Sequence, residues 1–405
     1  MDARPLNDVR VLDLGQVYNG PYCGLLLAAQ GAEVIKVEPP GGEIVRRAAI
    51  SPGGASYSFL MLNAGKKGVT LNLKHPRGRD LFLRLVAHAD VVLENFRDAS
   101  VLRDLGLAWE DLARANPRIV LASGRGYRAG SAYESFGAMD FTVQAISGHM
   151  SITGFPDQPP VKAGATLCDM LGSVHLFGAI LLALRERDRT GRGRPVEVAM
   201  LDATFPALMA YSSPYLETGV DVGRTGNRHS VPGSSPYGIY PTTDGWVAIM
   251  CVTDAHWRSF CEVTGEAELL ADEGLQTGRQ RAGQRDRIDE RVGAWTRHGS
   301  RDDVIARLSA GGVPCAPVRT LGEAVDDPYN VEQGLIRRTS YEGWGEVRVL
   351  GSPIQLREPG AGSERADAAP LAPPPRLGEH NREVLGRLLG LEDREIDDLV
   401  AAGAV

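Results

Sequence analysis

The sequence predicts an α/β fold built around a parallel β-sheet. Over the first 200 residues, short runs rich in Val, Ile and Leu alternate with segments of helical character. This alternation is typical of parallel sheets, because a helix carries the chain back to the start of each new strand. The chain has 405 residues, which is more than one typical domain but short of three.

The first predicted strand is "VRVLDL" at 9–14, and the helix "YCGLLLAAQG" at 22–31 ends at Gly31, a residue type that commonly ends helices. Further predicted elements are strands at 33–38, 68–73, 89–95, 118–123 and near 195, and helices that include 76–88 and the segment up to 211. We expect the helices to cover both faces of the sheet.

The second half of the chain lacks the regular alternation of strands and helices. Residues 212–235 are rich in Gly and Ser without periodicity and predict a long connection. A β-hairpin is predicted around Asp244-Gly245, followed by helical segments through about 310, so that 225–320 is expected to form a smaller α+β domain. Residues 357–380 predict an extended linker, and a short helix at 381–390 is expected to end the chain.

Composition excludes several classes of function. The net charge of -7 and the scattered arginines argue against nucleic-acid binding. Five widely spaced cysteines without a CxxC pair, and eight dispersed histidines, indicate neither a disulfide framework nor a metal site. The polar N-terminus and the longest apolar stretch, near 176–184, predict a protein without a signal peptide or membrane span, located in the cytoplasm.

Nucleotide-binding fingerprints are also missing. The loop after the first strand reads "GQVYNGP" instead of GxGxxG, and there is no Walker A sequence. Open α/β sheets nevertheless bind ligands at the carboxyl ends of their strands. We therefore expect the crevice at the loops 15–21, 39–47, 94–98 and 124–130. Basic residues near these loops could hold phosphates or form a solvated rim: Lys36, Arg46, Arg47, Lys66, Lys67, Lys74 and Arg77.

Asp169 stands at the start of a long apolar run, in "GATLCDMLGS". The plainest interpretation is a helix N-cap, because Asp is a preferred residue there. A carboxylate at a helix N-terminus could equally act as a nucleophile, since the helix dipole stabilises an anion. The neighbouring Cys168 could be a thiol nucleophile, but a buried packing residue is the better interpretation.

Several long blocks follow one another along the chain. They include "VRVLDLGQVYNGPYCGLLLAAQGAEVIKVEPPGG", "LNLKHPRG", "VVLENFRDASVLRDLGL", the long block around Asp169, and "RLGEHNREVLGRLLGL". Together these collinear blocks resemble the class III coenzyme A-transferases of the CaiB/BaiF type. The resemblance implies a Rossmann-like large domain formed by 1–211 and completed by 321–405, and an interlocked homodimer. In that layout 212–235 is the linker and 225–320 the small domain.

The resemblance also implies a mechanism. Asp169 falls on the catalytic aspartate of the family, whose carboxylate forms an aspartyl anhydride and then an aspartyl-CoA thioester. Coenzyme A and acyl-CoA would be substrates, with a small carboxylic acid as acceptor, and no permanent cofactor or metal would be needed. The remaining positions carried over are Gln16 and Asp140 at the reacting centre, and Val17, Tyr18, Leu71, Lys74, Asn95, Phe96 and Arg103 at the CoA site.

Differences from the typical family sequences restrict the substrates and the reaction that we expect. Formyl-CoA transferases carry a run of glycines where "RHSVPGSSP" has only Gly233, and some use a lysine where this chain has Gly137. Both differences argue against oxalate or formate as substrate. The related α-methylacyl-CoA racemases have a histidine where this chain has Met139, which cannot exchange a proton. A racemase and a CoA-binding protein without turnover remain as alternatives.

Overall fold

The computed structural model describes residues 4–48, 51–230, 233–356 and 371–405. The chain forms two compact units. Unit 1 comprises 1–147, 164–206 and 327–405, and unit 2 comprises 148–163 and 207–326, in each case as far as these residues are described. Residues 148–163 thus cluster with unit 2, although they lie inside the range expected for the large domain.

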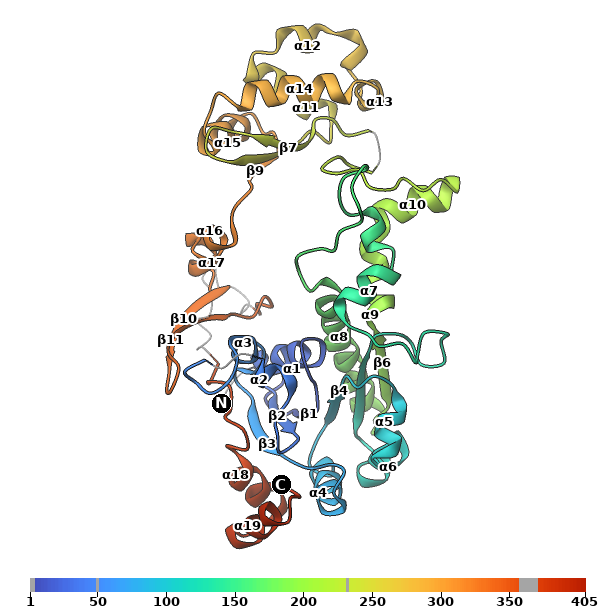
Figure 1. Cartoon of the computed structure of the whole chain (residues 1–405), viewed down its shortest axis with the longest axis vertical. Coiled ribbons are helices and arrows are strands. Elements are labelled where there is room, and N and C mark those ends of the chain that lie inside the picture. Colours follow the sequence, from blue (N-terminus) through green and yellow to red (C-terminus); the bar gives the residue numbers. More distant parts are fainter. Residues whose placement is uncertain (1–3, 49–50, 231–232, 357–370) are drawn as a thin grey trace. The chain divides into compact units, whose positions relative to one another are not determined.

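Unit 1 contains a six-stranded parallel sheet in the order β3-β2-β1-β4-β5-β6 (Figure 1). The strands are β1 (Arg10–Asp13), β2 (Glu33–Glu38), β3 (Lys67–Thr70), β4 (Val91–Glu94), β5 (Val120–Arg125) and β6 (Pro195–Ala199). Each lies within or next to a predicted strand, so the parallel α/β sheet is confirmed. The strand order reverses between β1 and β4, and such a switch point is where open sheets form a ligand crevice.

Helices cover both faces of this sheet. The helices of unit 1 up to residue 204 are α1 (Asn19–Ala29), α2 (Ile44–Arg47), α3 (Tyr57–Asn63), α4 (Pro76–Val86), α5 (Ala99–Asp104), α6 (Trp109–Ala115), α7 (Asp140–Ile146), α8 (Leu167–Thr190) and α9 (Met200–Thr204). Leu26 and Leu27 of α1 pack with Leu176 and Ile180 of α8 on one face. On the other face, α4, α5 and α6 contribute Phe82, Leu102 and Leu112 to a second core.

The C-terminal segment completes this second core. It contains α17 (Pro328–Glu332), the antiparallel pair β10 (Ile336–Tyr341) and β11 (Gly345–Leu350), α18 (Asn381–Leu389) and α19 (Asp393–Ala401). Val384, Leu385, Ile396 and Leu399 are at most 4% exposed and pack against the sheet. The predicted linker 357–380 lies outside the described residues up to 370, and 371–380 form no helix or strand. The helix predicted to end the chain is α18, but α19 follows it.

Unit 2 has its own core around Trp257, Phe260 and Val292. Its elements are η1 (His149–Ile152), α10 (Met209–Thr218), β7 (Tyr237–Pro241), β8 (Trp246–Met250), α11 (Asp254–Thr264), α12 (Ala267–Ala271), η3 (Glu273–Leu275), α13 (Gly278–Ala282), α14 (Arg285–Thr296), α15 (Arg301–Ala310), β9 (Cys315–Pro317) and α16 (Leu321–Val325). A further 3-10 turn, η2 (Phe205–Leu208), precedes α10. The predicted hairpin is the antiparallel pair of β7 and β8.

The long connection predicted from residue 212 begins later, because α10 continues to Thr218 with Pro214 inside it. A proline in a helix leaves the carbonyl four residues earlier without its usual N–H donor. That carbonyl belongs to Ala210, and it accepts a hydrogen bond from the Ser230 hydroxyl at 2.6 Å. This bond from Ser230 compensates for the proline. It comes from outside the helix, so the sequence predicted an end near residue 211 where the helix in fact continues to Thr218. Residues 231–232 of the predicted connection lie outside the described residues.

Candidate active site

Asp169 lies in the first turn of α8 and is 7% exposed. Its helix packs against α1, β5 and β6 through the face that carries Ser173, Leu176 and Ile180. The α8 segment is also apolar and long enough to cross a membrane by composition alone, with a mean hydropathy of 1.9 over its most apolar window. In this fold it is a helix of the α/β unit with one face in the core, and 44% of that window is buried, whereas Val174 and Leu182 on the opposite face are exposed.

Asp140 caps α8 from another element. It is the first residue of α7, and its Oδ1 accepts the backbone N–H of Cys168 at 2.7 Å and that of Asp169 at 3.3 Å. Its Oδ2 accepts from Nε2 of Gln144 at 2.6 Å. The interpretation of Asp169 as an N-cap is therefore wrong. Thr166 is the N-cap residue, Asp169 is the third residue of the helix, and the capping carboxylate comes from Asp140.

The pKa of Asp169 is raised to about 7, first because burial disfavours the charged carboxylate and second because Asp140 is negative and close. From the sequence, the N-terminal amides of α8 are expected to stabilise the ionised form of Asp169. Two of these amides donate to Asp140 instead, so their stabilisation goes to the neighbouring carboxylate. Asp169 consequently changes charge near neutral pH. Burial also raises the pKa of the Cys168 thiol, which packs with Tyr127 and Val143 and is no activated nucleophile.

The loop after β1 is held in one conformation by side chains from neighbouring strands. Asn95, directly after β4, accepts the N–H of Gln16 at 2.7 Å and donates to its carbonyl at 2.8 Å. Glu43 accepts the N–H of Val17 at 3.0 Å. Val17 has a φ of 65°, a conformation that β-branched residues rarely adopt. Such strain persists only where surrounding contacts impose it, and it is frequent at functional sites.

Buried ion pairs lie beneath this loop. Lys36 donates to the carbonyl of Gly15 at 2.7 Å and lies 3.4 Å from Glu43, and both charged side chains are 1% exposed. Lys66 pairs with Asp13 at 2.7 Å, and neither of these side chains is exposed. Burial lowers the pKa of Lys66, while Asp13 opposes this shift.

This arrangement corrects the expectation for the basic cluster. Lys36 and Lys66 are neither phosphate-binding donors nor parts of a solvated rim, because they support the backbone of the loop from inside. Arg46 is also buried and pairs with Glu38 at 2.6 Å. Sequence reasoning missed Asp13, Glu38 and Glu43 as their partners. The pairs of Lys36 with Glu43 and of Arg46 with Glu38 form across the turn between β2 and α2, whereas Lys66 and Asp13 are 53 positions apart in the chain.

The other predicted residues lie at different depths along the carboxyl edge of the sheet. Tyr18 and Phe96 are half-buried in the loops after β1 and β4. Leu71 follows β3, but its side chain is 1% exposed and belongs to the core. Lys74 is exposed in the loop before α4, and Arg103 is exposed on α5. The fold thus brings Gln16 and Asn95 into direct contact, whereas Lys74 and Arg103 stand on separate elements.

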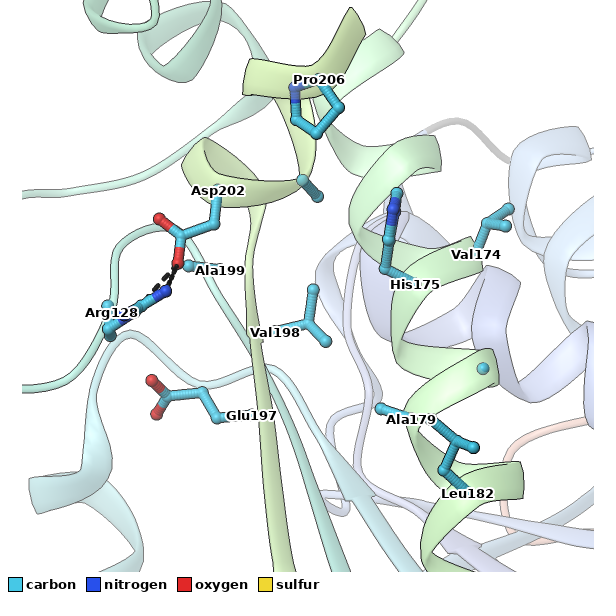
Figure 2. Close-up of a pocket in the computed structure, with 12 residues that line it drawn as sticks. Arg128, Val174, His175, Ala179, Leu182, Glu197, Val198, Ala199, Asp202 and Pro206 are labelled. Atoms are coloured by element: carbon cyan, nitrogen blue, oxygen red, sulfur yellow. Dashed lines mark hydrogen bonds and ion pairs between the residues drawn. The ribbon is translucent and has the colours of Figure 1, made fainter.

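A pocket of about 760 Å³ opens on the far side of α8 from Asp169. The pocket is lined by Val174, His175, Gly178 and Leu182 of α8, by Glu197, Val198 and Ala199 of β6, and by the ion pair of Arg128 and Asp202 (Figure 2). With 3.6 residues per turn, Val174, Gly178 and Leu182 lie on the helix face opposite Asp169. Leu182 is 74% exposed, so this pocket presents an apolar wall outside the predicted reacting centre.

Comparison with known proteins shows the same fold and closely related sequences. The family model described as CoA-transferase family III matches residues 6–381. The succinyl-CoA–D-citramalate CoA-transferase of Chloroflexus aurantiacus is 34% identical over 401 residues, covering 98% of this chain and 97% of that protein. The formyl-CoA:oxalate CoA-transferase of Streptomyces coelicolor is 33% identical over 433 residues, covering 100% of both.

A solved structure agrees with this grouping. The crystal structure of a CAIB/BAIF family protein from Brucella suis matches with a TM-score of 0.81 and 31% identity, covering 95% of this chain and 99% of that one. The resemblance inferred from the sequence is therefore confirmed, and this chain belongs to CoA-transferase family III, a family of enzymes of the EC 2.8.3 type.

Proposed function

We propose that this enzyme transfers coenzyme A from an acyl-CoA donor to a carboxylic acid acceptor, with Asp169 as the covalent nucleophile. The observation that supports this proposal most directly is the buried carboxylate of Asp169 in the first turn of α8, which has a pKa of about 7. A second carboxylate, that of Asp140, accepts a hydrogen bond from the backbone N–H of Asp169. Group transfer between carboxylates requires a carboxylate that can be acylated in a water-poor site.

The first half-reaction activates Asp169. Its carboxylate oxygen attacks the thioester carbonyl of the donor, a C–O bond forms, and the C–S bond breaks to release CoA thiolate. The product is a mixed anhydride between the donor acyl group and Asp169. The thiolate then attacks the side-chain carbonyl carbon of Asp169, which releases the donor acid and leaves an aspartyl-CoA thioester.

The second half-reaction reverses these steps with the acceptor. The carboxylate of the acceptor attacks the aspartyl thioester, releases CoA thiolate and forms a new anhydride. The thiolate attacks the acceptor carbonyl of that anhydride, which gives acceptor-CoA and the free Asp169 carboxylate. Each step exchanges one activated carboxyl group for another, so the sequence is balanced without an additional reactant.

The neighbouring groups have separate roles in this proposal. Asp140 adds to the effect of burial in raising the pKa of Asp169, and it caps the helix that carries Asp169. The fixed loop of Gln16, Val17 and Tyr18 lines the reacting centre, because Tyr18 directly precedes α1 and the first residue of α1 contacts the backbone of Asp169. Anhydride formation develops negative charge on oxygen, and a rigid polar loop can stabilise this charge without reorganisation.

CoA is proposed to lie along the carboxyl edge of the sheet. Asn95 and Phe96 at the switch point would contact the pantetheine, and the exposed Lys74 and Arg103 would pair with phosphates. The buried Leu71 can contribute only through its main chain. Succinyl-CoA occurs in the names of several relatives, and a short acyl-CoA and a small carboxylic acid are the proposed substrate class here.

A homodimer located in the cytoplasm is part of the same proposal. The family resemblance implies interlocked chains in which the large domain is completed by the C-terminal segment and the small domain follows the linker. The exposed apolar wall of Leu182 and Val174, 74% and 50% exposed, is a surface that a second copy would cover. Met139, beside Asp140, offers no exchangeable proton, so racemisation is not the activity proposed.

Trapping of the acylated enzyme tests the mechanism. During turnover with acyl-CoA, hydroxylamine should convert the activated Asp169 side chain to a hydroxamate that mass spectrometry locates in the α8 peptide. Asp169→Ala should abolish transfer, whereas Asp188→Ala, an exposed aspartate on the same helix, should retain it. A rapidly turning-over enzyme without a modified Asp169 peptide would overturn the proposal.

A further inference from the structure

Asn19 joins the first turn of α1 to the first turn of α8. Its Nδ2 donates to the backbone carbonyl of Asp169 at 3.2 Å. The Ser173 hydroxyl lies 2.7 Å from that carbonyl oxygen and 2.7 Å from the carbonyl oxygen of Asn19. Asn19 is 3% exposed and Ser173 is fully buried. The carbonyl of Asp169 therefore contacts a buried amide from another helix, Asn19 of α1, in addition to the hydroxyl of Ser173 in its own helix.

Two glycines leave the space that the Asn19 amide occupies. A Cβ atom added at Gly124 of β5 would lie 2.2 Å from Oδ1 of Asn19, and one added at Gly172 of α8 would lie 2.4 Å from Nδ2. Both distances are far below van der Waals contact, so neither position accepts a larger side chain while the amide keeps its place. The amide is thereby confined between the sheet and α8.

The confinement has an energetic cost. Oδ1 of Asn19 is buried and has no hydrogen-bond partner among the described residues. An unpaired buried acceptor loses its hydration without compensation. The bond from Nδ2 of Asn19 to the carbonyl of Asp169 therefore forms although the Oδ1 of the same amide stays unpaired. Such a local energetic conflict is typical of functional sites.

We propose that Asn19 is a positioning residue that fixes the backbone of Asp169 relative to the loop of Gln16, Val17 and Tyr18. The inference rests on the proposed role of Asp169 as nucleophile. Asn19 directly follows that loop, so a single side chain ties the loop and the nucleophile together. Misplacement of a reacting group by about 1 Å can cost about 100-fold in rate.

Three variants distinguish a positioning role of Asn19 from a role in packing alone. Asn19→Ala removes the bond and leaves a void, and Gly172→Ala places a methyl group against the amide. The double variant Asn19→Ala/Gly172→Ala fills part of the void and removes the clash with the amide, so that only Met200, whose Cγ lies 3.1 Å from the new Cβ, has to shift slightly. Alanine is also favoured over glycine inside a helix. We expect the melting temperature to fall in both single variants and to recover in the double variant.

Activity should not recover with stability. In Asn19→Ala and in the double variant, we expect kcat and the single-turnover rate of acylation at Asp169 to fall about 10- to 100-fold. The KM for acyl-CoA should change by less than about twofold, because the lost bond lies on the nucleophile and not on the predicted CoA contacts. Asn116→Ala is the matched control. Its amide donates to the carbonyls of Val86 and Ala89 at the opposite end of the sheet, so it should affect stability alone.

The outcomes distinguish this inference from the proposed function. If the unaltered enzyme gives no adduct at Asp169, the nucleophile assignment fails. If the unaltered enzyme is acylated there and the folded double variant is acylated equally fast, Asn19 is only a packing residue and the inference is overturned.

Discussion

The side chain of Asp140 accepts a hydrogen bond from the backbone N–H of Asp169 at 3.3 Å, so one carboxylate is anchored to the main chain of the other. The same contact holds Asp140 close enough to raise the pKa of the Asp169 side chain, in addition to the effect of burial. Asp140 thus stabilises the helix end and destabilises the negative charge of Asp169.

The first prediction concerns the pH dependence of turnover. Because the pKa of Asp169 is raised to about 7, the carboxylate fraction of the free enzyme should fall as pH drops through that value. The kcat/KM for acyl-CoA should therefore decrease below about pH 7. In Asp140→Asn the decrease should move to lower pH, since the amide can still cap α8 without a negative charge.

Initial rates from pH 5 to 9 measure this effect. Asp202→Asn, in the ion pair at the far pocket, is the control and should keep the profile of the unaltered enzyme. A profile for Asp140→Asn that coincides with the unaltered one would contradict the assigned cause.

The second prediction concerns stability in Asp169→Asn. The folded protein keeps a proton on Asp169 up to about pH 7, whereas an ordinary aspartate releases it near 3.8. Stability is therefore lost as pH rises between these values, because the folded state binds more protons than the unfolded state. Each pKa unit corresponds to about 1.4 kcal/mol. The free energy of unfolding of Asp169→Asn at pH 8 should therefore exceed that of the unaltered protein by about 2–4 kcal/mol.

Chemical denaturation at pH 8 and pH 4 provides the measurement. The gain should be largely absent at pH 4, where Asp169 is protonated in the folded protein and about half protonated in the unfolded chain. A gain of equal size at both pH values would mean that charge burial is not its source. Asp188→Asn on the same helix should give no gain at either pH.

The third prediction compares two adjacent lysines. Lys66 is fully buried against Asp13, while the Lys67 side chain is 31% exposed and lies between Glu33 and Glu383. Lys66→Met should cost about 3–5 kcal/mol because it leaves a buried carboxylate without a partner. Lys67→Met should cost about 1 kcal/mol or less. Urea unfolding measures the free energy of unfolding of both variants. Equal decreases would contradict the interpretation that the buried pair of Lys66 and Asp13 supports the loop after β1.

The fourth prediction concerns assembly. Light scattering should give a mass of about twice the 43.5 kDa of one chain. Leu182→Asp, on the exposed apolar wall of α8, should reduce the dimer fraction at low protein concentration because burial of a carboxylate in an interface is unfavourable. Val400→Asp, at an exposed position of α19, should leave the fraction unchanged. A monomeric unaltered chain would exclude the proposed homodimer.

The strands were predictable and the support of the site was not. Strand β4 begins with the apolar run Val91, Val92 and Leu93, which is typical of buried parallel strands, and β2 was predictable although it carries charged residues such as Lys36 and Glu38. Asp140, which caps α8, stands 28 positions before Cys168, whose backbone N–H it accepts. The paired Lys66 and Asp13 are 53 positions apart in the chain. No local pattern reports such pairs. Asp169 itself was identified through the family resemblance, whereas its local sequence favoured a cap.

The C-terminal helices have a consequence for biosynthesis. The ribosome completes β1 to β5 long before it reaches Val384, Leu385, Ile396 and Leu399, which close one face of that sheet. Until these residues emerge, Phe82 and Leu85 of α4 lack part of their cover, although domains generally fold from the N-terminus as they are made. The nascent sheet therefore has an open apolar face through most of translation. A chain terminated before α18 would keep this face exposed and be prone to aggregation.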